Sequence, residues 1–277
     1  MKKILIITIA FVGALGVYNA KAWGHQAHGT TAYIAEQHLT PEAKKKAHYY
    51  LKHTLPYYAS WMDAWKFSTK FRQVNSWHTG VAMEDGVNYN MKSSKFPGRV
   101  MRHLVKALAE LGDGKYKNLP DSVVRQRLIN MIHYVGDLHC PCHINFPKET
   151  FPHYRYSLNN NGKRVSFHRY WDGSLAWQGR GEWTYEEFAT LVDKVSPEQV
   201  AVWQSGTLED WGRDIVKLGH RAHEITTEGM DVSKMTKEQK AASIALTDEA
   251  ILMGGYRLAY VLNTIFSDGN IKTYNEE

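Results

Sequence analysis

The sequence predicts a mainly α fold, in which a single domain forms a multi-helix bundle with one short β-hairpin. Apolar residues recur at helical spacing over long stretches, helix-start signals precede several of them, and a paired strand signal occurs in one segment. The chain has 277 residues, of which 43% are hydrophobic and 22% charged. This ordinary globular composition excludes disordered, collagen-like and coiled-coil classes.

The first 22 residues are predicted to be a separate element. Two lysines precede an apolar run, Ile4–Val17, and Ala20-Lys21-Ala22 follows it. This pattern is typical of a cleaved secretory signal peptide, and the run is shorter than the roughly 20 residues of a membrane-spanning helix. We therefore expect a domain at residues 23–277 that begins with Trp23, is periplasmic or secreted, and is not stably inserted in a membrane.

Helices are expected throughout this domain. A helical stretch around Thr31–His38 precedes Thr40-Pro41, where Thr is a good N-cap and Pro favours the first helical position. In the longest predicted helix, at the C-terminal end, apolar residues recur every seven positions. Further helices are predicted at Arg99–Leu111, Asp121–Leu138, Tyr185–Val195, Pro197–Gln204, Leu208–Thr227 and Lys237–Phe266.

The hairpin is predicted within Tyr154–Phe167. Two short β-prone runs flank Asn159-Asn160-Asn161-Gly162, and an Asn-Gly pair between such runs is a strong hairpin signal.

Histidine is unusually frequent, with 14 residues, and the strongest motif runs from His133 to His143. His133 and Asp137 are four apart in a predicted helix, so both side chains project from one face. His143 follows where Pro141 turns the chain. Such a pair is a workable half of a metal site, although by itself it is more typical of a surface ion pair.

The pattern recurs elsewhere in the chain. His168 and Asp172 are again four apart, Asp63 and His78 each lie beside a tryptophan, and His28 follows the expected new N-terminus at Trp23. A terminal amine with a pKa near 8 is readily deprotonated by a metal and can chelate it together with its own carbonyl. Five such groups in one exported chain predict a metal centre.

The two cysteines, Cys140 and Cys142, flank Pro141. A disulfide across so short a loop would be strained. Zinc thiolates and simple buried thiols both remain open.

In order and spacing, these motifs resemble the class I zinc-dependent single-strand nucleases, the S1/P1 nuclease family, which is related to the trinuclear-zinc phospholipases C. The resemblance extends from Trp23 to Asp172 and is weaker beyond. It implies three Zn²⁺. One would be held by Asp63, His78, His133 and Asp137, a second by His143, His168 and Asp172, and a third by the amine and carbonyl of Trp23 with His28 and Asp137.

The resemblance also implies a function: an endonuclease that hydrolyses single-stranded RNA and DNA to 5′-phosphate products through a zinc-activated hydroxide attacking phosphorus, with 3′-nucleotidase activity alongside. Its partner would be single-stranded nucleic acid or a nucleotide, and the protein would be a monomer. Asp63 would be the carboxylate nearest the attacking water. Lys66 would contact phosphate, with a solvated lysine as the alternative.

Departures from the family pattern leave base recognition open. Thr79 follows His78 where the nucleases often have an aromatic residue, and the Gly-Gly-Asn segment after His143 is not evident. Two alternatives remain: a zinc phospholipase C, although those enzymes typically have Glu at the position of Asp172, and a zinc-scavenging protein. Aromatic residues that could stack on bases are Tyr57, Tyr58, Trp65, Tyr89 and Tyr154.

Overall fold

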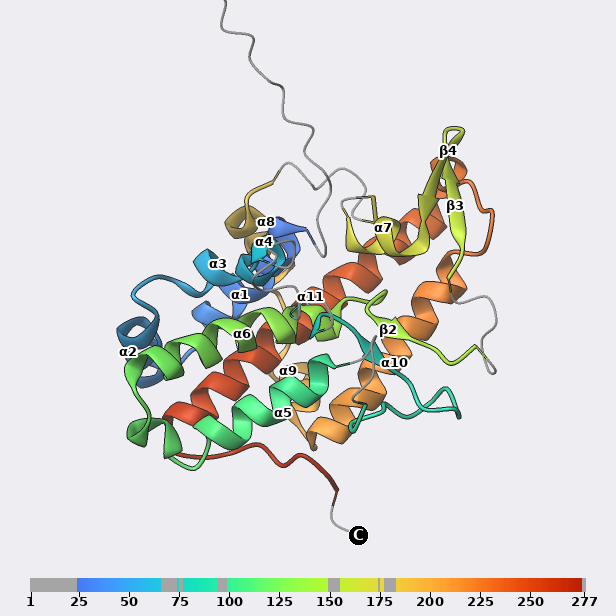
Figure 1. Ribbon diagram of the computed structural model, residues 1–277. Coiled ribbons are helices and arrows are strands. Elements are labelled where there is room, and N and C mark those ends of the chain that lie inside the picture. The colour runs from blue at the N-terminus through green and yellow to red at the C-terminus, as the bar shows by residue number, and fades with distance from the viewer. Residues whose placement is uncertain are drawn as a thin grey trace, which may run out of the picture.

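A computed structural model describes residues 24–65, 74, 77–93, 99–148, 155–173, 175–176 and 183–275. The fold is mainly α, as predicted, and helix α11 (Lys237–Phe266) runs through its middle. Helices α1 (His25–Gln37) and α6 (Asp121–His139) both pack against α11 (Figure 1). These three helices form the frame on which the remaining elements lie.

The first four helices follow one another closely. Helix α1 leads into α2 (Pro41–Leu51), where the Thr40 side chain accepts a hydrogen bond from the Ala43 N–H at 3.1 Å, which confirms the predicted cap. The short helices α3 (Leu55–Tyr58) and α4 (Trp61–Trp65) come next. Helix α1 begins six residues before the predicted start at Thr31, because packing against α6, α8 and α11 stabilises a first turn that has no side-chain cap.

Helix α6 follows α5 (Val100–Leu111) and the 3-10 helix η2 (Lys115–Asn118). The predicted bounds of α5 and α6 are each correct to within one residue. From Leu128 to His139 every residue of α6 is buried. A helix buried all round must satisfy its polar side chains inside the protein, so the environments of His133 and Asp137 are set entirely by tertiary packing.

The C-terminal half comprises α8 (Tyr185–Val192), α9 (Pro197–Gln204), α10 (Leu208–Ile225), the 3-10 helix η4 (Val232–Lys234) and α11. The bounds predicted for α9 and α11 are confirmed. Helix α8 ends three residues earlier than predicted, because Asp193 leaves the helix and pairs with His38 and Tyr256 instead. Helix α10 ends two residues early, because Thr226 has an extended conformation in which its carbonyl accepts from the Tyr156 hydroxyl and its side chain accepts from the Trp171 ring N–H.

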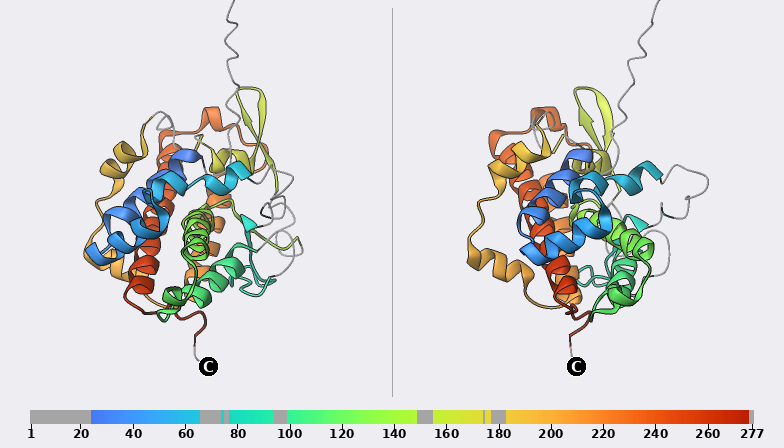
Figure 2. Two further views of the ribbon diagram at one scale, coloured as in Figure 1. Left: turned by 60° about the vertical axis from the view of Figure 1, so that its left-hand side comes forward. Right: turned by 90° about the vertical axis from the view of Figure 1, so that its left-hand side faces the viewer.

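The predicted hairpin is present as β3 (Ser157–Asn160) paired antiparallel with β4 (Lys163–Ser166). Asn161 and Gly162 connect the strands with φ values of 52° and 77°, the left-handed conformation that a two-residue turn requires. The hairpin projects from one end of the molecule, opposite the C-terminal segment (Figure 2). Helix α7 (Phe167–Asp172) continues directly from β4 and is capped by the Ser166 side chain.

One further strand pair was not predicted. Strand β1 (Gly80–Val81) pairs in parallel with β2 (Ile144–Asn145), and two residues are too few for strand periodicity to appear in the sequence. The pair holds the segment just after His78 beside the segment just after His143. In the part of the chain that is described, no helix is long and apolar enough to span a membrane.

Candidate metal centre

Seven of the predicted ligands meet at one place in the fold, and all seven are at least 95% buried. They come from four helices and two connecting segments, with α6 at the centre. The set consists of His28 from α1, Asp63 from α4, His78 before β1, His133 and Asp137 from α6, His143 after α6, and Asp172 at the end of α7.

The Asp137 carboxylate is the shared partner of four imidazoles. Its Oδ2 lies 2.8 Å from His78 Nδ1 and 2.9 Å from His133 Nε2. Its Oδ1 lies 3.0 Å from His143 Nδ1 and 3.4 Å from His28 Nε2. A single carboxylate therefore faces imidazoles on both of its oxygens, which is the arrangement a bridging metal ligand needs.

Asp63 closes one end of this cluster. Its Oδ1 lies 3.7 Å from His78 Nδ1 and 3.9 Å from His133 Nε2, and its Oδ2 lies 3.8 Å from His28 Nε2. The ring of His133 stacks on that of His28 at 4.3 Å between centroids. Two overlapping groups of donor atoms, each within 4.8 Å of one another, result: Asp63, His78 and His133, and His28, His133 and Asp137.

The orientation of His133 is set by a backbone group. Its Nδ1–H donates to the carbonyl oxygen of Ala59 at 2.7 Å, and a carbonyl can only accept, so this nitrogen carries the proton. Nε2 then faces the Asp137 carboxylate, 2.9 Å from its Oδ2. Metal-binding histidines are typically oriented by such an outer hydrogen bond. Nothing in the local sequence pattern around Ala59 pointed to this contact.

Asp172 forms the other end of the centre. Its Oδ1 lies 3.1 Å from His143 Nε2, and its Oδ2 lies 3.6 Å from His168 Nδ1. His168 differs from the other predicted ligands because about half of its side chain (52%) is exposed. The thiol of Cys140 also approaches Asp172, and a third group of neighbouring donor atoms comprises Cys140, Cys142, His143 and Asp172.

A glycine in α6 allows α1 to approach. A Cβ atom at Gly136 would lie 2.5 Å from Nδ1 of His28, much closer than any real contact. An isolated glycine inside a strong helical pattern signals such close packing, so this residue could have been singled out from the sequence.

The start of the described chain is held next to the centre. The Gly24 N–H donates to the carbonyl oxygen of Asp172 at 2.9 Å, and His25 Nδ1 lies 3.2 Å from the Ser60 hydroxyl, three residues before Asp63. Trp23, which directly precedes Gly24, and Lys66 lie outside the described residues.

Several ligand atoms of the cluster are buried without a hydrogen bond. Among the described residues, no partner bonds to either ring nitrogen of His28, to His78 Nε2, to His143 Nδ1 or to Asp137 Oδ1. An unsatisfied buried polar atom costs about 1–3 kcal/mol. His143 Nδ1 and Asp137 Oδ1 lie 3.0 Å apart yet are not oriented to bond to each other. Nitrogen and oxygen atoms aimed at a shared point are the donor set that a divalent cation satisfies.

The protonation equilibria reflect the same crowding. Burial by itself opposes protonation of His133, but Asp137 and Asp63 outweigh it and raise its pKa to about 9. The pKa of His143 is likewise raised, because Asp137 and Asp172 outweigh its burial. Burial dominates at His28 and His78 and lowers both pKa values. Although burial opposes it, the surrounding imidazoles hold the pKa of Asp137 well below its usual value.

The thiols sit in a different electrostatic setting. Cys140 and Cys142 are both free and buried, with their sulfur atoms 3.4 Å apart. Burial, together with the neighbouring Cys142 and Asp172, raises the pKa of the Cys140 thiol well above its usual value.

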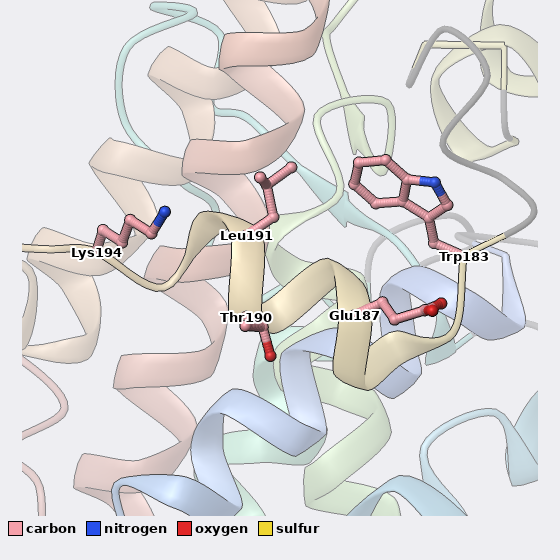
Figure 3. A pocket seen from close by; sticks show the side chains of 5 residues that line it. All are labelled: Trp183, Glu187, Thr190, Leu191 and Lys194. Atoms are coloured by element: carbon pink, nitrogen blue, oxygen red, sulfur yellow. The ribbon is translucent and has the colours of Figure 1, made fainter.

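A cavity of about 380 Å³ lies along α8, lined by Trp183, Glu187, Thr190, Leu191 and Lys194 (Figure 3). The carboxylate of Glu187 accepts a hydrogen bond from the Thr184 N–H and so caps α8. Glu187 therefore serves the helix start, and the cavity lies apart from the buried His and Asp groups around Asp137.

The aromatic residues predicted as stacking platforms differ in exposure. Tyr58 and Tyr89 are buried, whereas Tyr57 (61%) and Trp65 (37%) are exposed. Trp65 pairs with the exposed Trp61 at 5.3 Å between ring centroids, on the same short helix as Asp63. Tyr154 lies outside the described residues.

A mainly α fold with buried, overlapping His and Asp donor groups places the chain in the class of helical proteins that can hold metal ions in their interior. A sequence profile described as S1/P1 nuclease matches residues 23–267, and the chain belongs to this family of nucleases. It is also similar to Endonuclease 4 of Arabidopsis thaliana, with 20% identity over an alignment of 308 positions that covers 96% of this chain and 94% of that protein.

Proposed function

We propose that this nuclease is an exported trinuclear-zinc phosphodiesterase. It hydrolyses single-stranded RNA and DNA to products with 5′-phosphate ends and also acts as a 3′-nucleotidase. The observation that carries the proposal is the Asp137 carboxylate surrounded by four imidazoles, with ligand atoms left unsatisfied.

The two donor groups that share His133 support two of the ligand sets. Asp63, His78, His133 and Asp137 would hold one zinc ion, and His28 and Asp137 would hold another together with the amine and carbonyl of Trp23. The hydrogen bond from the Gly24 N–H to the Asp172 carbonyl supports the set that includes Trp23, because it holds Gly24 next to the centre. A third ion would be held by His143, His168 and Asp172.

When bound, zinc would supply Lewis-acid chemistry: it would polarise the phosphodiester and lower the pKa of a bound water to about 7. The chain's own residues supply position and charge. Asp63 lies at the edge of the cluster, where its carboxylate can orient a water against the substrate. Burial of the cluster keeps competing solvent away and strengthens every charge interaction in it. Lys66, one helical turn beyond Asp63 in the sequence, is proposed as a phosphate contact.

Single-stranded substrate is supported by the exposed pair Trp61 and Trp65 on either side of Asp63. Base–aromatic stacking contributes about 1–3 kcal/mol per base and tolerates any sequence. Because unpaired bases can reach such a surface and paired bases cannot, this pair favours single strands over duplexes.

The proposal is tested with a substrate panel. The mature protein is incubated with single-stranded DNA, single-stranded RNA, duplex DNA, a nucleoside 3′-monophosphate and phosphatidylcholine. We expect rapid cleavage of both single strands to 5′-phosphate ends, loss of activity on chelation and recovery with zinc. Cleavage of lipid alone would identify a phospholipase C, and zinc binding without turnover would identify a scavenging protein; either result contradicts the proposal.

The role of Trp23 as a ligand has its own test. A protein that keeps one extra residue before Trp23 has an amide in place of the terminal amine, so it should bind two zinc ions where the processed chain binds three. Metal analysis of the two forms, purified side by side, distinguishes these outcomes. Three zinc ions and full activity in the extended form would remove Trp23 from the ligand set.

A further inference from the structure

The turn after α6 gathers three potential donors on one side. The Cys140 carbonyl accepts a hydrogen bond from the His143 N–H at 2.9 Å, which closes the four-residue turn that contains Cys142. Helix α7 brings Asp172 against the same turn. Both thiols are more than 90% buried.

The four side chains are spaced like the ligands of one ion. The sulfur atoms lie 3.4 Å apart, Cys140 Sγ lies 3.7 Å from Asp172 Oδ1, and His143 Nε2 lies 3.1 Å from the same oxygen. Donors around a tetrahedral zinc at about 2.0–2.3 Å are separated by roughly 3.3–3.8 Å. Each measured distance is within a few tenths of an ångström of that range.

His168 fits this set less well than the thiols. The group in which every donor atom lies within 4.8 Å of every other contains Cys140, Cys142, His143 and Asp172 and leaves His168 out. The His168 side chain is also half-exposed, and it faces the opposite oxygen of Asp172 from the one that His143 and Cys140 approach.

We propose that Cys140 and Cys142 are thiolate ligands of the metal ion at His143 and Asp172, and that they take the place that the family resemblance assigns to His168. This inference rests on the proposed metal centre and revises one of its ligand sets. On binding, each thiol releases its proton to solvent as its sulfur bonds to the metal.

The consequence is that the centre contains one structural metal site beside its catalytic sites. Four protein donors leave no open position, which is typical of a structural zinc site and not of a catalytic one. Two thiolates and one carboxylate also give the site one surplus negative charge, whereas His143, His168 and Asp172 would leave one surplus positive charge. This ion would therefore hold α6 to α7, and phosphate would be bound at the Asp63 end.

Cobalt(II) provides a direct test, because thiolate ligation produces a charge-transfer absorption in the near ultraviolet that nitrogen and oxygen ligands do not. The chain contains only two cysteines, so any such band must come from them. The apo-protein is titrated with Co²⁺ alone. We expect the fully loaded protein to show the band at the intensity of a single cobalt ion with two thiolate ligands.

Variants separate the two ligand sets. Cys140→Ser and Cys142→Ser should each remove about half of the band, and the double variant should lose it together with one bound ion. His168→Ala should keep the band at full intensity. Circular dichroism of each apo-variant shows whether the helices are intact, and the wild-type spectrum tests the inference even where a variant does not fold.

Three results would overturn the inference. They are full cobalt loading of the wild type without the band, loss of the band in His168→Ala but not in Cys140→Ser, and a non-reduced mass two hydrogens lower, which indicates a disulfide. The outcome is independent of the nuclease proposal. A protein with the band that cuts no nucleic acid would refute the function and leave the ligand assignment intact.

Discussion

Helix α6 contributes to two buried polar clusters that are only a few residues apart. One is the candidate metal centre around His133 and Asp137. The other, the arginine cluster, comprises Arg257, His139 and Asp214 and joins α6 to α10 and α11. Both contain imidazole and carboxylate groups, yet they differ in how their hydrogen bonds are satisfied.

In the arginine cluster the guanidinium group of Arg257 has three hydrogen-bond partners. Arg257 is fully buried and donates to Asp214 Oδ2 at 2.6 Å, to the Trp203 carbonyl at 2.8 Å and to His139 Nε2 at 3.2 Å. The other ring nitrogen of His139 donates to the Val135 carbonyl at 2.8 Å. Burial and the Arg257 charge lower the pKa of His139 to about 3, so this histidine is neutral at physiological pH.

The contrast shows what distinguishes a structural cluster from a metal centre. Residue types are alike, but in the arginine cluster donors meet acceptors. In the cluster around Asp137, several buried ligand atoms have no hydrogen bond. A satisfied network stabilises the fold on its own. The unsatisfied network costs free energy until a cation occupies it. Metal removal should therefore lower the free energy of unfolding as well as abolish activity.

The largest expected effect breaks the metal centre at its shared ligand. Asp137→Asn keeps the shape but removes the charge that faces four imidazoles. Loss of an outer-shell partner costs metal affinity about 10–100-fold, so we expect loss of a direct, shared ligand to lower nuclease activity more than a hundredfold and to reduce the zinc content. Zinc per mole and turnover of single-stranded DNA measure this. Unchanged zinc content would exclude a bridging role.

The matched change in the arginine cluster is Asp214→Asn. It leaves the fully buried Arg257 without its charge partner, and breaking such a pair costs about 3 kcal/mol or more. We expect a lower free energy of unfolding in urea with the zinc content of the folded protein unchanged. If zinc were lost as well, the two clusters would be coupled through α6 and the contrast drawn between them would fail.

A smaller effect is expected where α1 approaches α6. Gly136→Ala gains about 1 kcal/mol of helix propensity, but its methyl group would lie 2.5 Å from Nδ1 of His28. His28 must then move, so we expect zinc affinity to fall about tenfold while global stability changes by less than about 1 kcal/mol. Titration against a competing chelator measures the affinity. Wild-type affinity would show that His28 is not a ligand.

The smallest effect is expected at a partly exposed pair, His38 and Asp193, which lie 2.9 Å apart. Burial opposes ionisation of Asp193, but hydrogen bonds from His38 and Tyr256 outweigh it and lower its pKa. Its stabilising contribution is therefore present above its unfolded pKa and is lost as the pH falls through its folded pKa. The contribution of such a pair is below about 1 kcal/mol.

Urea unfolding of wild type and Asp193→Asn, from pH 7 downward, measures this contribution. The difference between the two proteins should shrink as the pH falls below the unfolded pKa of about 3.9. A difference that persists unchanged below about pH 3 would mean that the ionised carboxylate is not the source of the stabilisation.

The sequence by itself determined the helices that have strong local signals and the order of the predicted ligands. Thr40 before Pro41 and the Asn161-Gly162 turn act through bonds and dihedral angles within a few residues, and the structure contains both. Membership in the nuclease family was likewise predictable from the spacing of the motifs, and the family match confirms it.

Only the tertiary structure decided which of those residues meet. The first turn of α1 and the β1–β2 pair depend on packing and not on local preference. Two contacts join residues that lie on different elements: the hydrogen bond from His133 to Ala59 and the approach of Cys140 to Asp172. The partial exposure of His168 likewise depends on how α7 packs. Sequence spacing predicts which residues are neighbours on one helix face, whereas contacts between elements depend on how whole helices pack. Those contacts decide which of the predicted residues can bind the same metal ion.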